Sequence, residues 1–497
     1  MIRISRAPAA ATATRVPVPA AARLPVAVTA VRLPVLGVAR LPVAVTAVRL
    51  PVLGVARLPV AVTASRMPVS AAARLSVAVM AACLVLVACS GGGTTAAPAG
   101  SASAPLSSAA VAKKGDGTLT IGTVLPQTGS LAYLGPPMFT GVNLALKEVN
   151  EAGGVLGKPV TKYDTDSGDT TTNIASQSAD KLLTQKVDAI VGAASSSVSE
   201  SIIDKITRAG VVQFSPANTS DKFTTINDRG LYFRTAPPDM LQGRVLGDLV
   251  VADGNDTVGI LAMQDSYGTG LADQVEKTVT DGGGEVVERV DYDPKAADFS
   301  ADVARIKAKN PKGIVLIGFE ETAKVVAELV KQGLTADKYK WYMVDGNMSN
   351  TNFVRAPKGT LDGVKGTLPG AAAPEAFQKK LLAVNPGLTE FTYAAESYDA
   401  VTLIALAAEV AKDDSGAAIA AKLAEVSKGG EKCTGFKECV DLLKAGKDID
   451  YEGVSGPVDF NEVGDPSVAT IGVYRYGADN KFDAAKAVEY RQGNIAG

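Results

Sequence analysis

The sequence predicts an α/β protein of two lobes, each a mostly parallel sheet with helices on both faces. From about Leu119 onward, short apolar runs alternate with amphipathic stretches of helical length, which is the pattern of strands and helices in parallel sheets. This regular region spans roughly 380 residues, more than one α/β core comfortably contains, so we expect two lobes.

The expected elements follow one another in regular alternation. Strands are expected at 119–125, 160–164, 189–192, 211–215, 257–264, 313–318 and 340–345. Helical patterns lie at 139–151, 171–186, 197–209, 239–252, 269–281, 299–309 and 320–333. A run of helices follows at 374–384, 393–412, 415–427 and 436–445, before a β-rich tail over 453–482.

The composition excludes several classes of function. The chain has 497 residues, with 50 Lys and Arg, 52 Asp and Glu and no His. Histidine-based catalytic triads, histidine zinc sites and histidine proton shuttles are therefore excluded. The four cysteines are too scattered for a zinc finger or an iron–sulfur cluster, so we expect no metal and no cofactor.

Charge is distributed unevenly along the chain. Residues 1–88 hold ten Arg and no acidic residue, which leaves the remainder with 40 basic and 52 acidic side chains and a net charge of −12. An acidic body argues against nucleic-acid binding, which needs a basic face.

The first 66 residues form a separate low-complexity region. Residues 23–39 recur without change as residues 40–56, and a partial third copy begins at Arg57. Each half of the unit contains a proline, which excludes a continuous helix, and the period matches no common solenoid. Three explanations remain open: a translated stretch upstream of the true start, a disordered arm, or a structural repeat.

Residues 67–88 are expected to be a signal peptide starting at Met67. Arg74 precedes an apolar run over residues 75–88, which is too short for a membrane span and typical of a signal-peptide core. The predicted compartment is therefore extracytoplasmic.

The end of this run resembles the lipobox of bacterial lipoproteins. Residues 86–89 read Leu-Val-Ala-Cys and are followed by Ser and three Gly. The resemblance implies lipidation of Cys89, with residues 89–116 as a flexible tether to the outer face of the membrane. An ordinary secretory signal with an incidental cysteine is the alternative.

Two further cysteines are expected to pair. Cys433 and Cys439 flank a short glycine-containing loop, and an oxidising compartment favours a local disulfide between them. Because the loop is small, the bond should hold the loop more than it stabilises the fold.

Ligands of open α/β sheets sit beyond the carboxyl ends of strands. The expected strand ends are rich in small and hydroxyl residues, at 126–135, 193–197, 215–219, 264–270 and 345–347. One serine of the run 195–197 is expected to cap the following helix, and hydroxyls with free N–H groups at a helix start can receive a carboxylate. Asp345, Glu320 or Glu321 is a candidate to face this point and take an ammonium group, although each acid alone is more often a solvated charge.

Six motifs in order resemble the branched-chain amino-acid-binding proteins of the type I periplasmic binding fold. The first is the stretch 121–160, which begins Ile-Gly-Thr-Val-Leu-Pro-Gln-Thr-Gly-Ser. The others are IVGAASSS at 190–197, FSPANT at 214–219, YGTG at 267–270, ESYDA at 396–400 and GPVDFNEVGD at 456–465. Together the matches cover residues 118–480.

The resemblance implies a hinge of three chain crossings, near residues 236, 368 and 450. The first lobe would comprise residues 117–236 and 369–449, and the second lobe residues 237–368 and 450–497.

The resemblance also implies site residues in the first lobe. Hydroxyls and main-chain amides matching Ser196, Ala217 and Thr219 would bind the carboxylate of an amino acid. Ser195 and Asn218 lie beside them in the sequence.

The second lobe would supply Tyr267 as an aromatic lid, Asp345 as the partner of the α-amino group and Phe319 as a further aromatic. Two departures from the family bear on the ligand: Tyr133 takes the place of the usual first-loop aromatic, and Asp345 is shorter than the usual Glu. Relatives on this fold bind amides, urea or aromatic acids.

The sequence therefore predicts a monomeric, lipid-anchored solute-binding protein. It would capture a small amino acid, of branched-chain type, in an interlobe cleft and deliver it to an ABC permease. The alternatives are a ligand sensor for a regulatory partner and a binding protein for amides, urea or aromatic acids. An enzyme is not expected, because His, a metal-ligand set and a G-x-S-x-G motif are all missing from the sequence.

Overall fold

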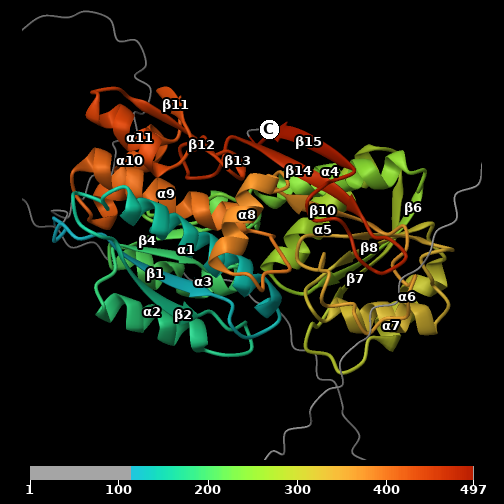
Figure 1. Cartoon of the computed structure of the whole chain (residues 1–497). Coiled ribbons are helices and arrows are strands. Elements are labelled where there is room, and N and C mark those ends of the chain that lie inside the picture. The colour runs from blue at the N-terminus through green and yellow to red at the C-terminus, as the bar shows by residue number, and fades with distance from the viewer. Residues whose placement is uncertain (1–113, 496–497) are drawn as a thin grey trace, which may run out of the picture. The chain divides into compact units, whose positions relative to one another are not determined.

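The computed structural model describes residues 114–495. They form two α/β lobes, each built on its own sheet (Figure 1), so the expected fold class is confirmed. The repeat over residues 1–66, the expected signal peptide over 67–88 and Cys89 lie outside the described residues, as does the expected tether up to residue 113.

The first lobe contains a five-stranded parallel sheet in the order β2-β1-β3-β4-β5. The strands are β1 (Thr120–Leu125), β2 (Thr161–Asp166), β3 (Ala189–Gly192), β4 (Val212–Ser215) and β5 (Tyr232–Arg234). The central strands are buried along almost their whole length, as expected for a sheet covered on both faces. At Gly192 (φ 127°) a Cβ would lie 2.0 Å from the carbonyl oxygen of Val124, so glycine is required where the chain leaves β3.

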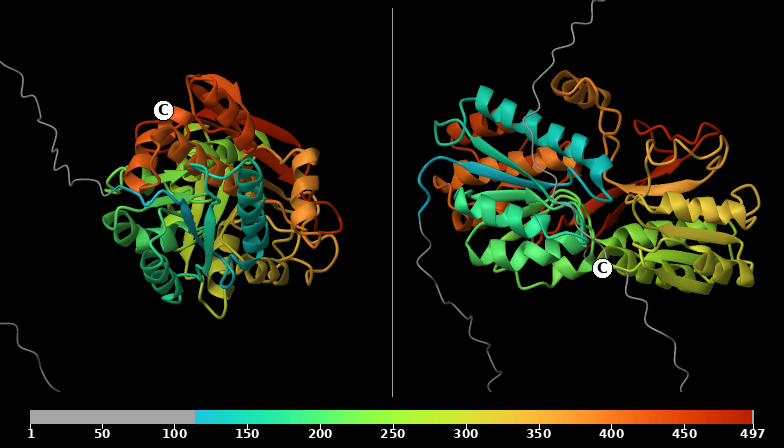
Figure 2. Two further views of the ribbon diagram at one scale, coloured as in Figure 1. Left: turned by 60° about the vertical axis from the view of Figure 1, so that its left-hand side comes forward. Right: turned by 90° about the horizontal axis from the view of Figure 1, so that it is seen from below.

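Helices from two distant parts of the chain cover this sheet. They are α1 (Gly135–Glu151), α2 (Ile174–Thr184), α3 (Ser196–Arg208), α8 (Glu375–Val384), α9 (Ala394–Ala411), α10 (Gly416–Val426) and α11 (Phe436–Lys444), with 3₁₀ turns η1 (Ala132–Leu134) and η2 (Asp221–Thr224). Helix α9 packs against α1 although some 250 residues separate them (Figure 2). Small strands β11 (Glu431–Cys433), β12 (Ile449–Gly453) and β13 (Gly456–Pro457) form a separate sheet beside these helices.

The second lobe contains a seven-stranded sheet in the order β15-β14-β10-β9-β8-β6-β7. Its strands are β6 (Thr257–Met263), β7 (Glu285–Tyr292), β8 (Gly313–Ile317), β9 (Lys340–Met343), β10 (Lys365–Pro369), β14 (Val468–Arg475) and β15 (Glu489–Asn494). Strands β14 and β15 run antiparallel to their neighbours and the others are parallel. Its helices are α4 (Asp239–Ala252), α5 (Ser266–Asp281), α6 (Ser300–Lys309) and α7 (Thr322–Lys331).

The chain passes between the two lobes three times, over residues 235–238, 370–374 and 458–467. The third passage comes later than the expected crossing near 450, because residues 449–453 form β12 and pair with β11. Arg234, the last residue of β5, forms a buried ion pair with Asp465 of the third passage, with 2.6 Å between Nε and Oδ1.

All helices and strands expected before residue 453 are present, with ends that differ by a few residues. The sequence predicts none of β5, β7, β10, β11 and β12. Strand β5 has three residues, and β7 is a partly exposed edge strand, so neither shows a clear apolar run. In the β-rich tail, β15 ends at Asn494 rather than near residue 482.

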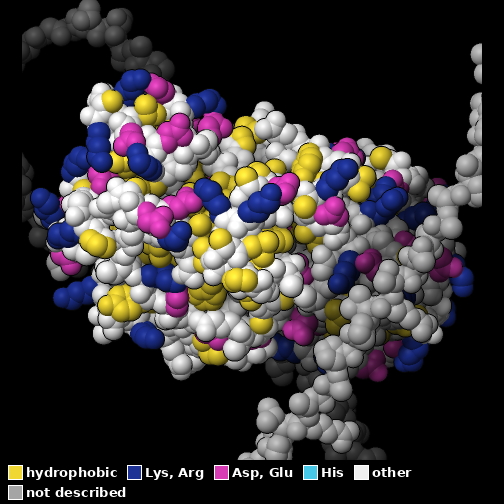
Figure 3. Space-filling view, in the orientation of Figure 1, with side chains coloured by type: hydrophobic (Ala, Val, Ile, Leu, Met, Phe, Trp, Pro, Cys, Tyr) yellow, Lys and Arg dark blue, Asp and Glu magenta, His cyan; other side chains and the backbone are white. Residues whose placement is uncertain are grey.

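The structure joins Cys433 and Cys439 by a disulfide between β11 and α11. Acidic and basic side chains are interspersed over the face shown in Figure 3. Within residues 114–495, no helix combines the length and apolar character needed to span a bilayer.

Candidate functional site

A small buried cavity lies where the two lobes meet. Its lining residues are Leu131, Leu134, Ala194, Ser195, Ser196, Ala217 and Tyr393 from the first lobe, and Tyr267, Phe319, Asp345 and Gly346 from the second. We call it the deep cavity. The space in which the centre of a water molecule can lie is about 10 Å³. The deep cavity therefore has room for about one water. The lobes are therefore closed against each other at this point.

The three consecutive serines at the start of α3 have three different roles. The side chain of Ser195 caps the helix and accepts a hydrogen bond from the N–H of Val198 at 3.5 Å. Ser196 lines the deep cavity, where its Oγ accepts a bond from the N–H of Ser220 at 3.3 Å. Ser197 points to the other lobe and donates to Oδ2 of Asp265 at 3.0 Å.

The loop after β4 brings only one of its three expected residues to the deep cavity. Ala217 lines it, and its N–H donates to Oγ of Ser215 at 3.2 Å. The side chain of Asn218 points away, because its amide donates to the carbonyls of Ala193 and Ala194 at 3.1 and 2.8 Å. It also accepts a bond from the hydroxyl of Tyr232 at 3.0 Å. These partners occupy the side chain of Asn218, which does not line the deep cavity.

Thr219 does not line the deep cavity either. It is buried, and its carbonyl accepts a 2.6 Å hydrogen bond from the N–H of Asp239 at the start of α4. This bond ties Thr219 to the first residue of α4.

Asp345 is the acidic residue that lines the deep cavity. Its Oδ1 accepts hydrogen bonds from Gln242 and from the hydroxyl of Tyr267, both at 2.8 Å, and its Oδ2 accepts one from the hydroxyl of Tyr393 at 2.6 Å. Burial raises the pKa of Asp345, and the bonds from Tyr393, Tyr267 and Gln242 oppose that rise. No Lys or Arg of the described residues forms an ion pair with this carboxylate. The site therefore presents a buried acid that is held by neutral donors alone.

Aromatic residues close the deep cavity from both lobes. Phe319 stacks on Tyr267 with 5.3 Å between the ring centroids. Tyr133 of η1 lies beside the deep cavity and donates to the carbonyl of Gly346 at 3.0 Å. Tyr133 therefore connects the first loop of one lobe to the acid-bearing loop of the other.

Asp166 holds that first loop in place. Burial would raise the pKa of Asp166, but hydrogen bonds from Thr128, Gly168 and Gln127 keep it below its usual value. Asp166, in the acidic run at 164–169, thus holds the first loop by hydrogen bonds. Among residues 114–495, no group of three or more metal-ligating side chains occurs in a suitable arrangement.

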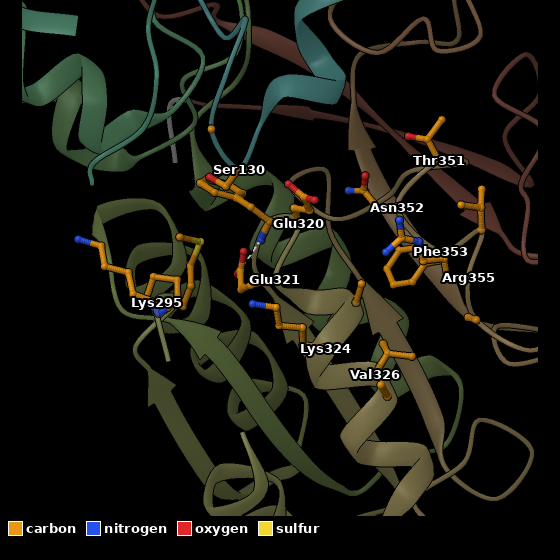
Figure 4. Close-up of a pocket in the computed structure, with 18 of the residues that line it drawn as sticks. Ser130, Lys295, Glu320, Glu321, Lys324, Val326, Thr351, Asn352, Phe353 and Arg355 are labelled. Carbon is orange, nitrogen blue, oxygen red and sulfur yellow. Dashed lines mark hydrogen bonds between the residues drawn. The ribbon is translucent and has the colours of Figure 1, made fainter. Parts of the chain in front are cut away.

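A second, larger cavity lies outside the deep cavity and shares Ser195 and Phe319 with it. We call it the outer cavity; its volume is about 1200 Å³. Glu320, expected near the ligand, lines the outer cavity and is exposed. Figure 4 shows Glu320 between Ser130 of the first lobe and the helix α7 of the second.

Sequence reasoning missed two partners of Asp345. Tyr393 is the residue just before α9, and its backbone is in the left-handed conformation with φ 62°. Gln242 comes from the first turns of α4. Neither residue lies at the end of a strand, where the sequence places its candidate ligand contacts.

Comparisons with known proteins show the family and the fold. A family model described as periplasmic binding protein matches residues 118–464. The chain is 28% identical over 352 residues to "Leu/Ile/Val-binding protein homolog 3" of Brucella melitensis, covering 67% of this chain and 90% of that protein. It is 25% identical over 364 residues to the "chemotactic signal transduction system substrate-binding protein BasB" of Halobacterium salinarum, covering 70% of this chain and 84% of that protein.

Among solved structures, the chain resembles the branched-chain amino acid transporter substrate-binding protein LivJ of Streptococcus pneumoniae, crystallised with isoleucine. The TM-score is 0.62 at 24% identity, with 76% of this chain and 99% of that chain covered. This likeness concerns the fold. Because the family model spans well over half of the chain, the protein belongs to the periplasmic binding protein family, with the type I two-lobed fold.

Proposed function

We propose that this protein captures a small zwitterionic amino acid, of branched-chain type, between its lobes and delivers it to an ABC permease. The observation that carries the proposal is the buried carboxylate of Asp345, which has neutral partners only. A ligand ammonium group would supply the missing positive charge. The names of the similar proteins, which refer to binding of leucine, isoleucine and valine, support this ligand class.

The opposite wall of the deep cavity suits a carboxylate. Ser195 and Ser196 stand at the N-terminus of α3, where backbone N–H groups and the helix dipole favour negative charge. Ala217 adds a small side chain beside them. The ligand would then extend from α3 in one lobe to Asp345 in the other, while Phe319 and Tyr267 cover it.

Ligand entry requires the lobes to separate. An amino acid needs far more room than a single water, so the deep cavity must widen to admit it. A ligand that contacts both lobes stabilises the closed state, which is a shift of population between open and closed forms. The three passages between the lobes would serve as the hinge.

The proposed location is the outer face of the cell membrane. Family membership supports an extracytoplasmic protein without enzymatic activity. We also propose that Cys89 carries a lipid and that the protein is a monomer.

A second candidate is a sensor that passes the closed form to a signalling partner. It is favoured by the similarity to the chemotactic binding protein of Halobacterium salinarum. Ligand capture would be the same in both cases. The two differ in the partner: the closed protein would stimulate the ATPase of a reconstituted permease in the first case, and a receptor in the second.

The direct test is a ligand panel. The purified full chain is unfolded and refolded to remove carried-over ligand, then heated with each of the twenty amino acids, urea, short amides and aromatic acids. A ligand at 100 times its Kd adds about 2.7 kcal/mol to the free energy of unfolding. A response to Leu, Ile and Val supports the proposal. A response to amides or aromatic acids alone contradicts the amino-acid assignment, and no response at all contradicts capture of this whole class.

A further inference from the structure

The starts of two helices, one from each lobe, meet outside the deep cavity. Helix α3 of the first lobe begins at Ser196, and α5 of the second lobe begins at Ser266. The two helices are in contact, and none of Ser197, Asp265 and Ser266 lines the deep cavity. The hydrogen bonds between these helix starts are therefore separate from the walls of the proposed ligand site.

The hydroxyl of Ser197 joins the two helices by two hydrogen bonds, which we call the Ser197 latch. It donates to Oδ2 of Asp265 at 3.0 Å and accepts a bond from the N–H of Ser266 at 3.1 Å. Oδ1 of Asp265 accepts a 2.7 Å bond from the N–H of Gly268 and so caps α5. The first N–H groups of a helix have no partner within the helix, so the first lobe supplies a partner that α5 itself lacks.

A second serine of the first lobe binds the same residue of α5. The hydroxyl of Ser220, in the loop after β4, donates to the carbonyl of Ser266 at 3.2 Å. Both side chains are buried. The N–H and the carbonyl of Ser266 are thus both bonded to serine side chains of the opposite lobe.

The position of Ser266 determines that of the next residue, Tyr267. Tyr267 lines the deep cavity, stacks on Phe319 and donates a hydrogen bond to Asp345. A displacement of the first turn of α5 would therefore move this aromatic lid and remove a donor from Asp345. Because Ser197 and α5 belong to different lobes, separation of the lobes breaks both bonds of the Ser197 latch.

We infer that Ser197 is a positioning residue whose latch sets the affinity of the protein for all of its ligands. The inference rests on the proposed function, because closure affects affinity only where a ligand is captured between the lobes. The latch forms when the lobes close on a ligand and holds Tyr267 over it. Since the Ser197 side chain does not line the deep cavity, it favours closure by the same factor whichever ligand is bound.

The test is Ser197→Ala in the refolded full chain, which removes the hydroxyl and keeps the backbone N–H at the start of α3. Calorimetry with leucine, isoleucine and valine should show binding weaker by at least about five-fold, by the same factor for each ligand. Stopped-flow fluorescence should place the loss in the dissociation rate and leave the association rate unchanged, because the latch forms after the ligand has entered.

Ser201→Ala is the matched control. Ser201 lies on the same helix, is exposed, and donates to the carbonyl of Val198 within α3, so its loss should change no affinity. A second variant, Asp265→Ser, keeps a capping oxygen for α5 and removes the acceptor of Ser197. It should weaken binding on its own and add little further loss to Ser197→Ala, since both changes break one contact.

Hydrogen exchange gives a readout at the latch itself. Saturating leucine should slow exchange in the first turn of α5 in the parent protein and slow it less in Ser197→Ala. Equal protection in the two proteins would contradict a latch at Ser266.

Unchanged affinities in Ser197→Ala, a factor that differs between the three ligands, or a loss confined to the association rate would overturn the inference. Leucine binding by the parent protein would still uphold the proposed function in each of these cases. If the parent protein binds none of the three ligands, the proposed function fails and the inference fails with it. The measurement on the parent protein thus separates the two failures.

Discussion

The hydroxyl of Tyr393 donates a 2.6 Å hydrogen bond to Oδ2 of Asp345, across the boundary between the two lobes. Tyr133 makes a second bond across that boundary, to the carbonyl of Gly346. Both tyrosines belong to the first lobe and both reach the loop after β9. The acid that is proposed to bind the ligand is therefore also a point at which the closed state is held together.

We expect Tyr393→Phe to weaken ligand binding by about ten-fold or more, because hydrogen bonds to charged groups contribute about 1.5–3 kcal/mol. The loss should appear mainly in the dissociation rate, measured by stopped-flow fluorescence. Tyr163→Phe, at a side chain that is 40% exposed, is the control. Equal dissociation rates for the two variants would show that the Tyr393 bond does not hold the closed state.

Asp345→Asn should weaken the binding of zwitterionic amino acids more than about ten-fold, since the amide cannot neutralise an ammonium group. Calorimetry with leucine measures the effect. The control is Asp362→Asn, which removes the same charge at an exposed position. An unchanged affinity in Asp345→Asn would remove Asp345 from the site.

The buried pair of Arg234 and Asp465 should be critical for stability. Arg234→Met leaves the Asp465 carboxylate buried without its cation, which costs about 3–5 kcal/mol in the free energy of unfolding. Urea denaturation measures the loss. The exposed pair of Arg208 and Asp204 provides the control, because Arg208→Met should cost at most about 1 kcal/mol.

Glu396 of α9 should make the protein less stable as the pH rises. Burial raises its pKa from 4.5 to about 8, and Asp399 on the same helix adds to the rise; Tyr393 and Tyr474 also face it. The folded state prefers the protonated form, so its contribution to stability is full below pH 4.5 and is lost as the pH rises to about 8.

The substitution Glu396→Gln isolates this effect. The melting temperature of the variant should exceed that of the parent protein above pH 8, and the difference should shrink toward pH 4.5. A difference that stays constant over this range would assign the pH dependence to other carboxyl groups.

Removal of the disulfide by Cys433→Ser and Cys439→Ser should cost about 2 kcal/mol or less, since the closed loop is short. Hydrogen exchange should speed up in β11 and α11 and stay unchanged near Asp345. A loss of ligand affinity in this double variant would contradict a local role for the bond.

Much of the fold could be predicted because strands and helices alternate with clear apolar periodicity. The site could be predicted in part, since Ser196, Ala217, Tyr267 and Asp345 each follow a strand and reach the deep cavity. The sequence cannot show which way a side chain turns inside a loop.

Three residues illustrate the limit. The side chain of Asn218 does not reach the deep cavity because its amide donates hydrogen bonds to backbone carbonyls of the loop after β3. Thr219 is tied to α4 because its carbonyl accepts a hydrogen bond from the N–H of Asp239. Tyr393 is the residue just before α9, and its own backbone is in the left-handed conformation. Each placement depends on contacts between segments far apart in the chain, which local patterns do not encode.

The packing of α9 on α1 constrains the order in which the protein can form during synthesis. All strands of the first sheet are complete by Arg234, but the helix that covers α1 ends only at Ala411. Until a ribosome has made that helix, the apolar surface it covers stays open to water. A nascent chain of this design therefore keeps its first lobe unfinished until late, which suits a polypeptide that must cross a membrane before it folds.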